Sequence, residues 1–199
     1  MRNININVYK LDELSEEVQN NVISHFRNFL SDDFCDELDV SMNEEFNTYV
    51  STLDFTLSYS LSYCQGDGVS FAGTVDNKEE LLKLANLVYS GNIPRKVLRL
   101  INRGIIYMVN FDRFNSHYTH KYTVTPIVAD NYNIDDTFRI TNTINEFEMA
   151  IKCWYYTICD NLEKFGYDKM TYLSSDDNIR DYIVENDLEF FADGRNYNE

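Results

Sequence analysis

The segment Arg113–His120, RFNSHYTH, contains the side chains best suited to catalysis. Histidine changes charge near neutral pH and can act as a general acid or base. His117 and His120 could together cleave a phosphodiester without a metal, while Arg113 or Lys121 stabilises the developing charge. On an extended strand these two histidines would point to opposite faces, so the segment must turn to bring them together. The competing interpretation is a pair of polar hairpin residues that form surface hydrogen bonds.

A second candidate is the segment Gln65-Gly66-Asp67-Gly68. Its glycines are too few for a phosphate-binding loop, and an apolar strand pattern follows instead of a helix. The glycines therefore suit a hairpin turn that needs positive φ angles. Asp67 could be a ligand or an acid, although an aspartate at this position commonly accepts hydrogen bonds from turn amides. Gln65 has no clear role in a turn and could make a specific contact.

Alternating residue types precede this turn. In TLSYSLSY, apolar side chains alternate with hydroxyls, which is the period of a half-buried strand. The row Ser58, Ser60 and Ser62 is either a face for close packing of another element or a polar recognition surface. In the second case it would act with Gln65, Asp67 and Tyr118. A metal site would need a third ligand beside the histidines, so we expect neither a metal nor another cofactor.

The remaining elements follow from hydrophobic periodicity and from capping residues. Strands are expected over residues 4–9, 56–63, 69–75, 105–111, 121–128 and 188–191. Helices are expected over residues 16–30, 33–50, 78–88, 94–102, 142–164 and 176–183. Hairpins grouped between helices indicate the α+β class, with helices packed on an antiparallel sheet of about four to six strands. No Pro-, Gly- or Ser-rich linker divides the chain, so a single domain over residues 1–199 is expected.

The formal net charge of −16 argues against direct binding of nucleic acid, which requires Lys and Arg. No Lys or Arg occurs between Arg27 and Lys78. The acids of this interval form either a solvated helix face or a docking surface for a basic protein; they are Asp32, Asp33, Asp36, Glu37, Asp39, Glu44 and Glu45. The sequence shows neither a signal peptide nor a membrane span. The four cysteines lack metal-site spacing, which favours buried free thiols in a reducing cytoplasm.

Several segments resemble a family of small bacteriophage proteins often labelled antitoxins of toxin–antitoxin stability systems. The matching segments are YKLDELSEEV (Tyr9–Val18), SYSLSYCQGDGVSFAG (Ser58–Gly73), RFNSHYTH (Arg113–His120) and YLSSDDNIRDYIVENDLEFFADG (Tyr172–Gly194). The characteristic motif is S-x-x-x-x-Q-G-D-G-x-x-F-x-G, and Lys121 stands where the family usually carries an acid. The resemblance implies a phage or prophage protein acting in the cytoplasm of a bacterial host. By analogy with other small acidic phage proteins, it also suggests a counter-defence or anti-CRISPR role.

Three functions are therefore compatible with the sequence. The first is an accessory protein whose acidic surface binds and inhibits a basic host protein, such as a CRISPR nuclease. The second is a nucleotide-binding protein or a metal-independent phosphodiesterase that uses Asp67, Arg113, His117 and His120. The third is the antitoxin of a toxin–antitoxin pair. A homodimer is compatible with each of them.

Overall fold

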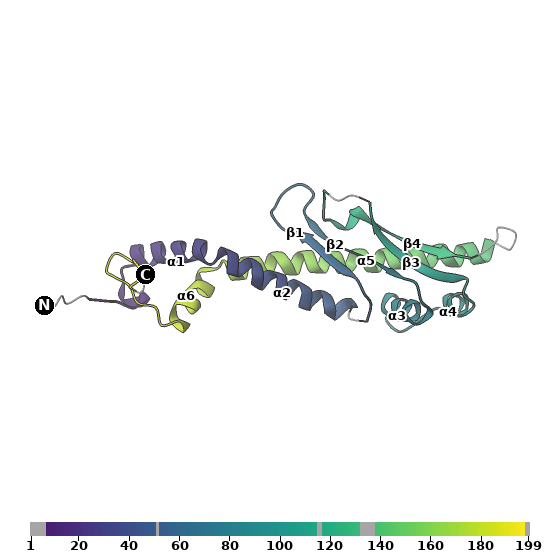
Figure 1. Ribbon diagram of the computed structural model, residues 1–199, viewed down its shortest axis with the longest axis horizontal. Coiled ribbons are helices and arrows are strands. Elements are labelled where there is room, and N and C mark those ends of the chain that lie inside the picture. Colours follow the sequence, from purple (N-terminus) through teal and green to yellow (C-terminus); the bar gives the residue numbers. More distant parts are fainter. Residues whose placement is uncertain (1–6, 51, 115–116, 132–137, 198–199) are drawn as a thin grey trace. The chain divides into compact units, whose positions relative to one another are not determined.

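The computed structural model describes residues 7–50, 52–114, 117–131 and 138–197 (Figure 1). The chain forms two compact units. Unit 1 contains residues 1–40 and 167–199, and unit 2 contains residues 41–166. The division falls inside two continuous helices, α2 (Ser31–Val50) and α5 (Phe138–Leu173), so each of these helices contributes residues to both units. The sequence carries no linker signal because helical segments join the units.

Unit 1 is built from both ends of the described chain. Its elements include the short 3₁₀ turn η1 (Leu11–Glu13), α1 (Glu16–Phe29) and α6 (Asp176–Glu185). Helix α1 packs against α6, and their apolar faces form a small core; it contains Leu11, Leu14, Val22, Ile23, Phe26, Leu30, Ile179, Ile183 and Phe190. The Ser175 side chain caps α6 by accepting a hydrogen bond of 3.2 Å from the backbone N–H of Asn178.

The strands expected at residues 4–9 and 188–191 contribute a single bridged pair within the described residues. Tyr9 and Phe190 exchange backbone hydrogen bonds of 2.8 and 2.9 Å, and Phe190 also bridges to Asn196. Residues 4–6 lie outside the described part of the chain. The two segments thus pair with each other, although over a shorter length than the strands that the sequence predicts.

Unit 2 contains a four-stranded antiparallel sheet with helices packed on it, which confirms the predicted α+β class (Figure 1). The strands lie in the order β1 (Thr56–Ser60), β2 (Gly68–Val75), β3 (Ile106–Arg113) and β4 (Val124–Asp130). Helices α3 (Lys78–Val88) and α4 (Arg95–Asn102) connect β2 to β3. Asn77 caps α3 by accepting from the N–H of Glu80 at 2.9 Å, as its position predicts.

The core of unit 2 centres on Phe71 of β2, which is fully buried. Its ring lies 4.5 Å from that of Tyr155 and 5.9 Å from that of Trp154, both on α5. The rings of Phe46 on α2 and Phe55 lie at 5.3 and 5.2 Å. These contacts fix the sheet against α5, and burial raises the pKa of the Tyr155 hydroxyl far above its ordinary value.

Several boundaries differ from the sequence prediction. The strand expected over residues 56–63 ends at Ser60, so Leu61, Ser62 and Tyr63 belong to the following loop. The strand expected over residues 121–128 begins as the 3₁₀ turn η2 (Lys121–Thr123) and becomes β4 only at Val124. The long helix expected over residues 142–164 extends in both directions to Phe138 and Leu173. Within the described ranges, none of the helices combines the length and apolar composition needed to cross a membrane.

The cysteine thiols are free, and most of them are exposed. Cys159 on α5 is buried, and burial raises its pKa to about 12. Cys35, Cys64 and Cys153 are exposed, so the expectation of buried thiols is correct for Cys159 and wrong for these three. Cys35 and Cys153 lie on helices of amphipathic pattern but face outward, which the sequence alone did not distinguish.

Candidate binding surfaces

The QGDG segment belongs to a loop that runs from Leu61 to Asp67 and joins β1 to β2. Gly66 and Gly68 have φ angles of +94° and +144°, which confirms that both glycines serve the backbone. The Asp67 carboxylate accepts a hydrogen bond of 2.6 Å from the Ser60 hydroxyl and one of 2.6 Å from the Cys64 N–H. These two bonds lower the pKa of Asp67. In this structure Asp67 therefore satisfies the turn amide, whereas the Gln65 side chain is exposed.

Replacing Asp67 with asparagine is expected to lower the melting temperature near pH 7, because the charged acceptor of two hydrogen bonds is lost. A carboxyl whose pKa is lowered by folding stabilises the protein above its unfolded-state value of about 4. This stabilisation is lost as the pH falls through the lower folded-state value. The difference between the two proteins should therefore shrink at about pH 3. Thermal unfolding followed by circular dichroism tests this, with exposed Asp76→Asn as a control that should show a smaller difference near pH 7.

The segment after β3 folds over the small residues of the β1–β2 hairpin. The Tyr118 ring packs on Gly66: a Cβ added at Gly66 would lie only 2.0 Å from Tyr118 Cδ1. The Thr119 N–H donates to the Gly66 carbonyl at 3.2 Å. His120 packs on Gly68, where an added Cβ would lie 2.9 Å from the Cβ of the histidine. These contacts explain both glycines as points of close approach between two loops.

The serine row divides between structural roles. Ser58 pairs in register with Ser70 of β2, and Ser70 is fully buried. The Arg113 guanidinium donates from Nη2 to the Ser70 hydroxyl at 2.6 Å. Ser60 bonds Asp67, whereas Ser62 lies beyond the end of β1 and is exposed. Ser58 and Ser60 are thus half-buried and Ser62 is exposed, so both alternatives for this row remain predictions.

Three of the four catalytic candidates make identifiable structural contacts. His120 Nδ1 accepts a hydrogen bond of 3.2 Å from the Tyr122 N–H and caps the turn η2. Arg113 holds Ser70, and Asp67 holds its own loop. His117 is exposed. No group of three or more His, Cys, Asp or Glu side chains in the described residues could hold a metal ion.

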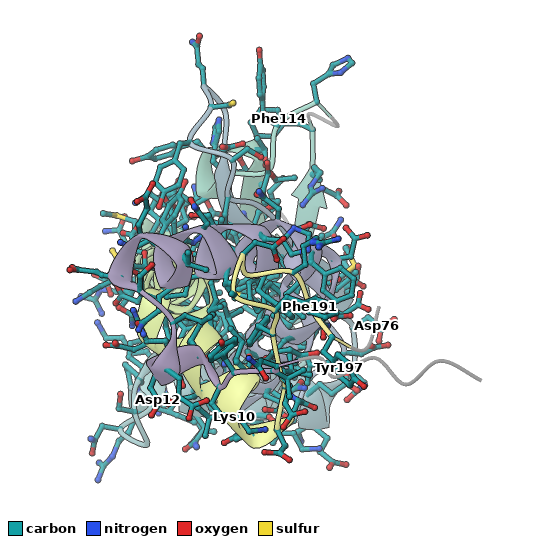
Figure 2. All side chains as sticks on the ribbon, turned by 90° about the vertical axis from the view of Figure 1, so that its left-hand side faces the viewer. Lys10, Asp12, Asp76, Phe114, Phe191 and Tyr197 are labelled. Atoms are coloured by element: carbon teal, nitrogen blue, oxygen red, sulfur yellow. The ribbon has the colours of Figure 1, made fainter. Side chains whose placement is uncertain are left out.

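An aromatic ladder lies beside the β1–β2 loop of unit 2. It consists of Tyr118, His120, Tyr122 and Tyr156, whose successive ring centroids lie 6.1, 5.8 and 5.5 Å apart. Tyr118 is 43% exposed and Tyr122 is 61% exposed. Phe114 is a further exposed aromatic residue of unit 2, at 68% exposure, and its backbone N–H donates to the carbonyl of Thr123, the residue after Tyr122. Figure 2 shows Phe114 among the loops at the upper end of the sheet.

Sequence reasoning proposed Tyr118 as a binding residue and did not consider Tyr122 or Phe114. Tyr118, His120 and Tyr122 are spaced two residues apart in the sequence. Strand periodicity does not explain their alignment, because the chain enters the 3₁₀ turn η2 at Lys121; the ring contacts depend on the fold of this segment. Tyr156 could not be assigned from spacing either, because its partner in the ladder is 34 residues earlier in the chain.

The acids predicted as a partner surface lie on α2. All are exposed except Glu45, which is half-buried; the set is Asp32, Asp33, Asp36, Glu37, Asp39, Glu44 and Glu45. Leu38, Met42 and Phe46 form the buried stripe of this helix. Asp32 through Asp39 belong to unit 1, whereas Glu44 and Glu45 belong to unit 2. The acidic surface considered below therefore consists of the unit 1 residues alone.

The negative charge is concentrated in unit 1. Its sequence holds 18 Asp and Glu against six Lys and Arg, a net charge of −12, whereas unit 2 holds 15 against 11, a net charge of −4. The described basic residues of unit 1 are already engaged. Lys10 pairs with Asp187 and Glu189, Arg27 with Asp176, Lys169 with Glu37, Arg195 with Asp193, and Arg180 donates to Gln19. No ion pair with a described residue neutralises Asp32, Asp33 or Asp36.

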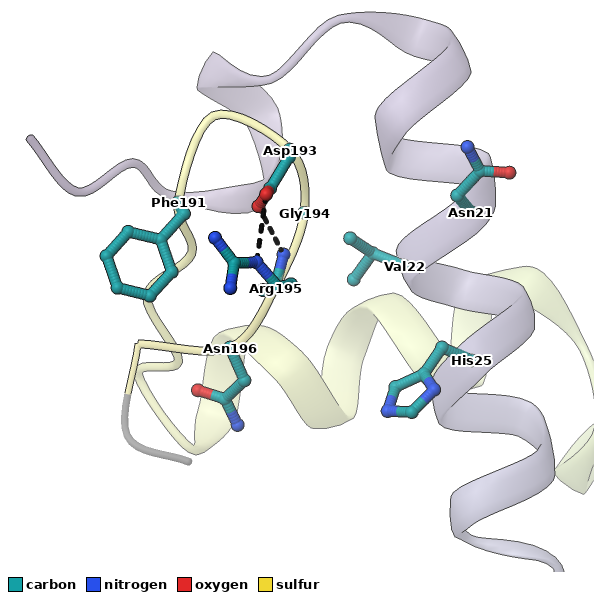
Figure 3. A pocket seen from close by; sticks show the side chains of 8 residues that line it. All are labelled: Asn21, Val22, His25, Phe191, Asp193, Gly194, Arg195 and Asn196. Atoms are coloured by element: carbon teal, nitrogen blue, oxygen red, sulfur yellow. Dashed lines mark hydrogen bonds and ion pairs between the residues drawn. The ribbon is translucent and has the colours of Figure 1, made fainter.

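A pocket of about 400 Å³ lies within unit 1, between α1 and the loop after Phe190 (Figure 3). Asn21 and His25 line it from α1, and Asp193 and Arg195 face each other across the loop. The Arg195 Nε donates to the Asp193 carboxylate at 2.9 Å, and Arg195 lowers the pKa of that carboxyl. The guanidinium therefore stabilises its own loop. Because Arg195 and Asp193 balance each other's charge, this pair leaves no unpaired charge for a ligand in the pocket.

Comparison of the chain with protein-family models, with curated proteins and with solved structures gave no match.

Proposed function

We propose that this chain is an accessory protein of phage or prophage origin that binds a basic surface of a host protein and blocks it. The observation that carries the proposal is the net charge of −12 on unit 1, whose described cations are already engaged by their own neighbours. A nucleic-acid-handling defence enzyme, such as a CRISPR nuclease, offers the matching basic groove. The chain would act in the cytoplasm of the bacterial host.

The working face of this proposal is the first two turns of α2. Asp32 and Asp33 stand in the first turn, where the helix dipole favours acids, and Asp36 follows one turn later. Exposed acids of this kind accelerate the encounter with a basic partner and lose strength as salt screens them. Occupation of a basic groove by this face would exclude nucleic acid from it. A cognate toxin with a basic surface would satisfy the same requirement.

The test uses the full chain, immobilised and exposed to lysate of a bacterial host. Removing three charges with Asp32→Asn, Asp33→Asn and Asp36→Asn should weaken binding of the specific partner about tenfold, if each exposed ion pair contributes about 0.5 kcal/mol. The dissociation constant of that partner is then measured at low and at high sodium chloride. Binding should weaken as the salt concentration rises.

A matched triple variant controls for total charge. Asp54→Asn, Asp76→Asn and Glu146→Gln remove three exposed acids from unit 2 and should leave the dissociation constant within about twofold of the original. Equal losses with both triple variants would show that the effect is nonspecific. Unchanged binding and inhibition with the α2 variant would show that the acidic face is not the working surface.

A further inference from the structure

We propose that the aromatic ladder of unit 2 binds arginine side chains of the partner. This inference rests on the proposed function, because it names the chemistry of the same partner. Exposed tyrosine rings at an interface supply large, rigid contact areas and commonly carry much of the binding energy. Tyr122 and Phe114 are more than half exposed, and Tyr118 nearly so.

The rings of the ladder already interact with one cation. Lys121 Nζ lies 5.3 Å from the ring centroid of Tyr122 and 5.8 Å from that of Tyr156, within the range of a cation–π interaction. Asp160 pairs with this ammonium group and raises the pKa of Lys121. The rings therefore already accept one cation, and Asp160 balances its charge. Tyr122 is 61% exposed, so part of its ring remains open to a planar guanidinium, and the ion pair with Asp160 offsets the charge of Lys121 beside it.

Arginine fits this surface better than lysine does. A guanidinium is planar, stacks on aromatic rings and is weakly hydrated, whereas an ammonium is compact and strongly hydrated. The charge on unit 1 attracts arginine and lysine alike, because both carry one positive charge. A preference for arginine would therefore report on the ladder, independently of the acidic face.

The ladder is held in place before any partner binds. Tyr118 rests on Gly66, His120 rests on Gly68, and the His120–Tyr122 hydrogen bond of 3.2 Å fixes the turn between them. A preorganised surface loses little conformational entropy on binding. Stacked rings also suit nucleic-acid bases, but unit 2, which carries the ladder, has a net charge of −4 and no excess of cations for binding phosphates. The charge favours a basic protein segment as the occupant.

The test compares labelled oligoarginine and oligolysine peptides of equal length by fluorescence anisotropy with the full chain. The wild-type protein should bind oligoarginine about two- to fivefold more tightly for each ring engaged. Tyr122→Leu keeps an apolar side chain but removes the ring, and should reduce this ratio by about the same factor. Tyr107→Leu, at another exposed tyrosine of unit 2, is the matched control and should leave the ratio unchanged.

The outcomes separate the ladder from the acidic face. The triple variant of Asp32, Asp33 and Asp36 should weaken binding of both peptides equally and preserve their ratio. Equal affinities of wild-type protein for the two peptides, or a ratio that survives Tyr122→Leu, would overturn the ladder proposal and leave the acidic-face proposal standing. Tighter binding of oligouridylate than of oligoarginine, abolished by Tyr122→Leu, would also overturn it, in favour of a nucleic-acid ligand.

Discussion

Phe71→Ala is expected to lower the free energy of unfolding by about 3–5 kcal/mol, the usual cost of removing a fully buried phenylalanine side chain. Phe71 contacts rings from both α2 and α5, including Phe46 and Tyr155, so the cavity would be lined from several elements. These elements cannot all move to fill it. Urea denaturation can be followed by the fluorescence of Trp154, the single tryptophan of the chain, whose ring lies 5.9 Å from Phe71.

Phe114→Ala is the matched control, because it makes the same chemical change at a side chain that is 68% exposed. Its effect on stability should remain within about 0.5 kcal/mol. A loss at Phe71 no larger than the loss at Phe114 would contradict the assignment of Phe71 to the centre of the core. A shift of the urea midpoint, with no change in the slope of unfolding free energy against urea concentration, would show that the substitution changes stability.

Gly68→Ala should destabilise the protein by about 2–4 kcal/mol. The φ angle of +144° imposes strain of about 1–3 kcal/mol on any residue with a side chain. The new Cβ would also lie 2.9 Å from His120 Cβ and 3.2 Å from His120 Cα, so backbone as well as side chain must shift. Because His120 lies inside the aromatic ladder, the same substitution should reduce the preference for oligoarginine.

Gly104→Ala measures the cost of backbone strain without a steric clash. Gly104 has a φ of +67°, but an added Cβ would meet no atom within 4 Å. This variant should lose about 1–2 kcal/mol from backbone strain alone and should leave the peptide ratio unchanged. Denaturant titration of both variants gives the two stabilities. If Gly68→Ala lost no more than Gly104→Ala, the close approach of His120 to Gly68 would add no cost beyond backbone strain.

The class of fold and most elements could be predicted from local signals. Asn77 and the apolar period of residues 78–88 identify α3, and the glycines of the QGDG segment identify the turn. The length of α5 was not predicted: the expected helix covered residues 142–164, whereas α5 runs from Phe138 to Leu173. The division into units was also invisible, because it crosses helices and leaves no change in composition.

The candidate site could be predicted only in part. Gly66 and Gly68 were assigned to a turn, but their contacts with Tyr118 and His120 join loops more than 50 residues apart. Periodicity describes one element at a time and does not indicate which loop lies against which. The acidic interval was visible in the sequence, whereas its concentration in unit 1 depends on which distant residues share that unit.

Unit 1 is assembled from two distant segments of the chain, residues 1–40 and 167–199, and this affects synthesis on the ribosome. When residues 1–40 emerge, the apolar face of α1 has no α6 to pack against, because residues 176–185 are made last among the helices described. Unit 2 is continuous, so all its residues are available before unit 1 can close. During translation, Val22, Ile23 and Phe26 therefore lack their α6 partners until residues 176–185 have been made.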